Sequence, residues 1–102
     1  MQKNWEVKIR ENPASLLKDI YIFRHPYPGK IEILHGDKIE AIEDNGANII
    51  EPSLRLYPEI LQELTEELNQ RGFKPQQGFL EGKIEATEKH LEDMRKLVFK
   101  NL

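Results

Sequence analysis

The sequence predicts an α+β fold, in which a small N-terminal antiparallel β-meander precedes a C-terminal antiparallel helical hairpin with one long helix. β-branched and aromatic residues gather in the first half of the chain, whereas the second half carries apolar residues at helical spacing. A length of 102 residues suits a single domain. We expect one domain over residues 1–102, with a β-rich part at 1–51 and the helical hairpin at 57–101.

Strands and turns alternate in the first half. Residues 5–10 alternate apolar and charged side chains, which is typical of a half-buried strand. Asn12 and Pro13 predict the start of a short helix, because Asn caps helices and Pro suits their first position. The expected elements are, in order, a strand at 5–10, one or two helical turns at 14–18, a hairpin of 20–23 with 31–34 around a turn at 26–29, a third strand or short helix at 38–42, a turn at 44–46, and an extended segment at 49–52.

Two helices are expected in the second half. The first follows Pro58, a favoured residue at the first helical position, and ends at Gly72, where glycine supplies a left-handed cap. The second is expected from Gln76 to Lys100, because ion pairs at four-residue spacing, Glu85–Lys89 and Glu92–Lys96, accompany an apolar seam. That heptad seam consists of Leu80, Ile84, Thr87, Leu91, Met94 and Val98.

The two predicted helices differ in length, roughly 21 Å against 37 Å at 1.5 Å per residue. The shorter helix would therefore leave the seam from Leu91 to Val98 uncovered. Either the strands of the same chain or a second copy of the long helix could bury it. The regularity of the seam favours a second copy, so we expect a homo-oligomer formed through the long C-terminal helix.

Composition excludes several classes of function. The net charge is −3, which makes a broad nucleic-acid-binding surface unlikely. Without cysteine, disulfides, Cys zinc sites and thiol catalysis are excluded. No apolar stretch is long enough for a membrane span, and the N-terminus lacks a secretory apolar core, so a cytoplasmic location is expected.

One group of candidate ligand-binding residues lies near the tip of the predicted hairpin. Arg24, His25 and Tyr27 combine a guanidinium, an imidazole and an aromatic ring, which together can bind a phosphate and stack on a base. The same residues also suit an ordinary turn with solvated side chains.

A second candidate group surrounds the start of the long helix. Lys74 stands beside exposed helix N–H groups, and Phe79 could stack on a planar ligand. Gly78 and Gly82 recur at four-residue spacing with Ala86, which indicates either a later helix start, close helix or subunit packing, or a ligand. Three further candidates in this half are Lys83, His90 and Arg95.

Metal and catalytic chemistry are not expected. The spacing of His25, His35 and His90 matches no metal-ligand pattern. The many carboxylates read as solvated helix faces rather than as an acid–base pair. We therefore expect no cofactor, no metal and no enzymatic activity.

The segment from Glu81 to Lys100 carries a resemblance to a known family. It looks like the C-terminal helix of small proteins encoded by bacteriophages of Gram-positive hosts, and it loosely resembles the helical hairpin of the anti-Thoeris and anti-CBASS sponges. That hairpin carries an Ala-x-Thr-His-Leu-Glu-acidic pattern, of which Ala86-Thr87 and His90-Leu91-Glu92-Asp93 are present, with Glu88-Lys89 inserted. The resemblance implies a non-enzymatic oligomer that sequesters a cyclic-nucleotide immune signal.

We therefore expect a phage-type binding protein that captures a small anionic, nucleotide-like ligand, such as a cyclic nucleotide or an ADP-ribose derivative, in the host cytoplasm. The alternative is a protein–protein inhibitor or scaffold of the anti-CRISPR type, which would bind its target through the acidic helical face of Glu59, Glu63, Glu66 and Glu67.

Overall fold

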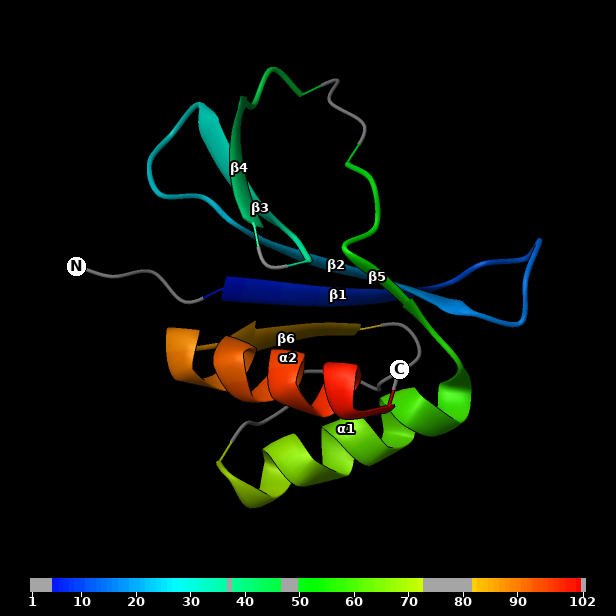
Figure 1. The fold of residues 1–102 in the computed structure, drawn as a ribbon. Coiled ribbons are helices and arrows are strands. Elements are labelled where there is room, and N and C mark those ends of the chain that lie inside the picture. The colour runs from blue at the N-terminus through cyan, green and yellow to red at the C-terminus, as the bar shows by residue number, and fades with distance from the viewer. Residues whose placement is uncertain (1–4, 37, 47–49, 73–81, 102) are drawn as a thin grey trace.

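The computed structural model describes residues 5–36, 38–46, 50–72 and 82–101 (Figure 1). Along the described chain, strands precede the first helix, and one further strand separates it from the second helix. The elements in order are β1 (Trp5–Glu11), β2 (Lys18–Arg24), β3 (Lys30–His35), β4 (Lys38–Glu43), β5 (Leu54–Leu56), α1 (Pro58–Gln70), β6 (Gly82–Ala86) and α2 (Glu88–Asn101).

All strand pairs in the described part of the chain are antiparallel, and they form one six-stranded sheet. The strand order is β4-β3-β2-β1-β6, so the N-terminal strand β1 lies between β2 and the late strand β6. One edge of β2 is shared. Its C-terminal end pairs with β3 through Phe23 and Arg24, whereas its N-terminal end pairs with β5 from Lys18 to Ile20.

Both helices pack on the same face of this sheet (Figure 1). The reason is visible in β1, where Trp5, Val7 and Ile9 are buried while Lys8 and Arg10 on the other face are exposed. The core cluster joins that face to both helices: Trp5, Val7, Ile9, Ile20, Ile22, Leu34, Leu56, Leu61, Leu64, Leu68, Ala86, Leu91, Met94 and Val98.

Helix α1 confirms the predicted helix signals. Pro58 occupies the first turn after Tyr57, which is extended, and Glu59 lies in the first turn. At the other end Gly72 has φ +90°, the left-handed conformation that ends helices, and its N–H donates to Asn69 O at 3.1 Å.

The predictions for the first half are confirmed for its strands and wrong for its short helix. Residues 38–42 belong to a strand, β4. Residues 13–17 form turns rather than a helix, because side chains take the backbone N–H groups. Asn12 Oδ1 accepts from Ala14 N–H at 3.0 Å, and Ser15 Oγ accepts from Leu17 N–H at 3.0 Å. These turns link β1 to β2.

The predicted architecture of a small meander and a helical hairpin is contradicted. Residues 82–86 are not helical but form β6, which pairs with β1 from Trp5↔Ala86 to Ile9↔Gly82. The strand portion is therefore larger than expected, and the second helix starts only at Glu88. The apolar spacing wrongly predicted one continuous helix because Ile84 and Leu91 stand seven residues apart. In the structure Ile84 lies in β6, opposite Val7. Leu80 and Gly78 lie outside the described residues.

The seam that was expected to be uncovered is buried by the chain itself. Leu91, Met94 and Val98 are only 4, 3 and 1% exposed, and they belong to the same core cluster as β1 and α1. The expectation that these residues form a subunit interface is therefore wrong, because β6 and its neighbours bring the sheet beneath α2. The chain's own strands, the other possibility that the sequence left open, cover the seam.

Replacement of Met94 by Glu tests this packing. A carboxylate cannot be buried among apolar side chains without a partner, so we expect the monomer to unfold, with a loss of at least about 3 kcal/mol in the free energy of unfolding. Lys89→Glu, an exposed site on the same helix, serves as the control. Urea titration followed by circular dichroism measures both. A folded, helical Met94→Glu monomer would show that this stripe is not core.

Candidate functional site

Arg24, a predicted phosphate-binding residue, is engaged within the protein. It ends β2 on the helix-covered face, where Nε and Nη2 both donate to Glu32 Oε2, at 3.2 and 2.9 Å. Its Nη1 donates to Glu88 Oε1 at 3.1 Å, and the guanidinium carbon lies 4.5 Å from the centre of the Trp5 ring. The Arg24 side chain is only 18% exposed. Its contacts join two strands to the first turn of α2, so its donors are engaged within the protein.

His25 and Tyr27 do not converge with Arg24 on a common site. His25 Nδ1 lies 3.8 Å from Asp44 Oδ2, and its ring packs edge-on against Phe23 with 5.9 Å between centroids. Tyr27 is exposed in the β2–β3 turn, where its carbonyl accepts from Lys30 N–H at 3.2 Å. The hairpin tip is thus an ordinary turn, the reading that the sequence left open.

The second predicted group is largely outside the described residues. Lys74 and Phe79 both lie there. Lys83 is placed by its backbone on β6, opposite Lys8, and its side chain is not among those described. Residues 75–77, where the sequence predicts the helix N-terminus, also lie outside the described residues, and α2 starts at Glu88.

His90 has a structural role at that helix start. Thr87 Oγ1 accepts from His90 N–H at 3.3 Å, and His90 Nδ1 accepts from Thr87 N–H at 3.2 Å. This is the reciprocal arrangement of a capping box, with His in the place usually held by Glu or Gln. Thr87, predicted to belong to the seam of a continuous helix, instead caps the shorter helix.

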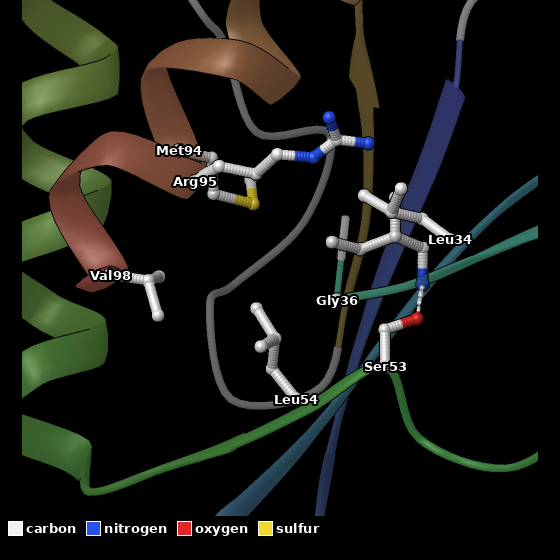
Figure 2. A pocket seen from close by; sticks show the side chains of 8 residues that line it. Leu34, Gly36, Ser53, Leu54, Met94, Arg95 and Val98 are labelled. Carbon is white, nitrogen blue, oxygen red and sulfur yellow. Dashed lines mark hydrogen bonds between the residues drawn. The ribbon is translucent and has the colours of Figure 1, made fainter. Parts of the chain in front are cut away.

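Arg95 lies at a small apolar notch, which Figure 2 shows from close by. The notch lies where β3 and β5 separate along β2, and residues of α2 form one of its sides. Its walls are Ile22, Leu34, Gly36, Ser53, Leu54, Met94, Arg95 and Val98. Its free space of about 10 Å³ holds about one water-sized group, so it has no room for a nucleotide.

A larger hollow lies on another side of α2, between this helix and the C-terminal end of α1. This α1–α2 cleft has a volume of about 610 Å³ and is lined by Arg71, Lys89, His90, Asp93, Lys96 and Leu97. Of the predicted site residues whose side chains the structure describes, only His90 lines it. Arg71, Lys89 and Lys96 were missed because the sequence presents them as partners of nearby acids. The spacing of Lys89, Asp93 and Lys96, four and then three residues, indicates one helix face and could have revealed them.

Three bases, Arg71, Lys89 and Lys96, line the α1–α2 cleft together with one acid, Asp93. Arg71 Nη1 lies 3.1 Å from Asp93 Oδ1, a contact that also ties the end of α1 to α2. Two acids flank the bases, the half-buried Glu67, with Oε2 3.9 Å from Arg71, and the exposed Glu92, with Oε1 3.5 Å from Lys96. Exposed pairs of this kind contribute only about 0–1 kcal/mol, so an anionic ligand can compete for these bases. Lys89 has no ion-pair partner among the described residues.

Metal binding has no site in the described part of the chain. No three His, Asp or Glu side chains gather there in a way that could hold an ion. His35 is paired with Glu40 at 3.8 Å, far along the sheet from the cap that holds His90.

Comparison with known proteins gives no family. No family model matches the chain, and no curated protein or solved structure matches it either. Neither helix, over the residues that the structure describes, is long and apolar enough to cross a membrane.

Replacement of Arg24 by Met tests whether this residue is structural. It would leave the Glu32 carboxylate, 21% exposed, without its main partner, so we expect the free energy of unfolding to fall by about 1–3 kcal/mol. Arg10→Met, an exposed arginine on the opposite sheet face, should change it by less than about 0.5 kcal/mol. Urea denaturation gives both values. Equal stabilities for the two variants would contradict the role assigned to Arg24.

Proposed function

We propose that this protein is a non-enzymatic binding protein that holds a small phosphate-bearing ligand of nucleotide size in the α1–α2 cleft. The observation that carries the proposal is the convergence of Arg71, Lys89 and Lys96 on one hollow. A volume of about 610 Å³ lies within the range of roughly 300–1,000 Å³ that is usual for small-molecule sites.

The residue types suit both parts of a nucleotide. Guanidinium and ammonium groups bind phosphate oxygens, Arg71 in a planar fork and the lysines as point charges. Asp93 Oδ1 is held by Arg71, and its carboxylate has further lone pairs that can accept from sugar hydroxyl or base amino groups. Leu97 adds an apolar wall.

We propose that the ligand belongs to the class that the family resemblance implies, a cyclic-nucleotide or ADP-ribose-derived immune signal, and that the protein sequesters it for a phage in the host cytoplasm. Two of the residues that carry the resemblance, His90 and Asp93, line the α1–α2 cleft, which supports this choice. The helical hairpin of that family gives no support, because residues 82–86 form a strand.

A protein–protein inhibitor is the second candidate. The observation that favours it is the solvent face of α1, where Glu59, Glu63 and Glu66 are exposed. Such a face would bind a basic partner surface without using the α1–α2 cleft.

A thermal-shift screen against cyclic di- and trinucleotides and cyclised ADP-ribose derivatives tests the proposal. A ligand at 100 times its Kd should stabilise the fold by about 2.7 kcal/mol. The double variant Lys89→Glu/Lys96→Glu should lose at least about tenfold in affinity, because two attractive charges become repulsive. Lys38→Glu on β4, away from the cleft, should bind as the native protein does.

No stabilisation by any member of the panel would overturn the nucleotide proposal and leave the inhibitor. Binding that persists unchanged in the double variant would overturn the α1–α2 cleft as the site, even if a ligand is found.

A further inference from the structure

Arg95 is a half-buried base that has no partner among the residues that the structure describes. Its Nε is buried and makes no hydrogen bond to them, and none of their carboxylates pairs with its guanidinium. The other arginines of the described chain all have contacts: Arg10 with the Tyr21 ring, Arg24 with Glu32 and Glu88, Arg55 with Asp19, and Arg71 with Asp93. A buried donor without a partner is unfavourable, so Arg95 calls for an acceptor that the described chain does not supply.

The surroundings of Arg95 define what that acceptor is attached to. Arg95 extends from α2 over the notch toward the side where Leu34 lies (Figure 2). Four aliphatic residues and Met94 form most of the wall: Ile22, Leu34, Leu54, Met94 and Val98. Because β3 and β5 use different ends of β2, no strand of the described residues closes the sheet at this point.

Water is a poor occupant of the notch. A buried water usually makes two to four hydrogen bonds, and the polar side chains of the lining are those of Arg95 and Ser53. The lone pairs of the Ser53 hydroxyl are partly used, since Ser53 Oγ accepts from Ile22 N–H at 3.1 Å. A methyl-sized apolar group needs no such partners and fits a free space of about 10 Å³.

We propose that Arg95 and this notch form a second ligand site, separate from the α1–α2 cleft, that binds a short-chain carboxylate. The carboxylate oxygens accept from the guanidinium, which presents a planar fork of donors, and the methyl group enters the notch. The two sites lie on different sides of α2, since Lys89, Asp93 and Lys96 line the cleft and Met94, Arg95 and Val98 line the notch.

Titration of ¹⁵N-labelled protein with sodium acetate, observed at the arginine Nε–H resonances, tests the proposal. We expect a saturable shift of the Arg95 resonance and no comparable shift for Arg10, with sodium chloride as the ionic control. Formate lacks the methyl group and should bind about fourfold more weakly, the effect of one lost apolar carbon. Arg95→Met should abolish the shift of neighbouring backbone amides, and Arg10→Met should preserve it.

Arg95→Lys keeps the charge, loses the fork and should weaken acetate binding while the fold is kept, which covers the case in which Arg95→Met does not fold. A linear shift that chloride reproduces would overturn the site. Equal affinity for formate and acetate would remove the notch from it, and a long-lived water beside Arg95 Nε that acetate does not displace would show that water is the occupant.

Discussion

The pairing of β6 with β1 is the constraint on which the rest of this fold depends. It joins strands about 80 residues apart in the chain, from Trp5↔Ala86 to Ile9↔Gly82, and places β1 in the interior of the sheet. In the sequence, β6 lies between α1 and α2. Its pairing at the edge of the sheet, beside β1, therefore brings both helices to one sheet face. Closing so long a loop costs entropy, and the apolar contacts of Leu91, Met94 and Val98 with the core offset that cost.

The start of α2 connects this pairing to the candidate sites. Glu88, two residues after the end of β6, accepts a hydrogen bond from Arg24 Nη1. The hydrogen bonds between Thr87 and His90 cap the helix and fix where it begins. The residue at which α2 begins determines which of its side chains face the core, the notch and the α1–α2 cleft. Met94 enters the core, Arg95 lies at the notch, and Lys89 and Lys96 face the α1–α2 cleft. An uninterrupted helix from residue 76 would not require this distribution of side chains among the core, the notch and the cleft.

Residue patterns within short segments predicted the elements that form from neighbouring residues. The alternation of β1, the β2–β3 hairpin and both ends of α1 follow from residue spacing and from Pro58 and Gly72. Residues 82–86 could not be assigned in this way, because their strand exists only through a distant partner, and His at the third position of α2 concealed the cap. For the sites, the residue types indicated anion chemistry, and of the residues they named, His90 lines the α1–α2 cleft and Arg95 lines the notch. Arg24 was misjudged because one acceptor, Glu88, is remote in sequence, and the other, Glu32, lies opposite Arg24 only through the register of β2 with β3.

The most direct test of this account is the pattern of backbone nuclear Overhauser effects over residues 82–101. The account predicts cross-strand contacts that join Val7 to Ile84 and Trp5 to Ala86, strand-type sequential contacts up to Ala86, and helical contacts only from Glu88 onward. Helical contacts that run unbroken from before Gly82 to Asn101, without any contact to β1, would contradict it.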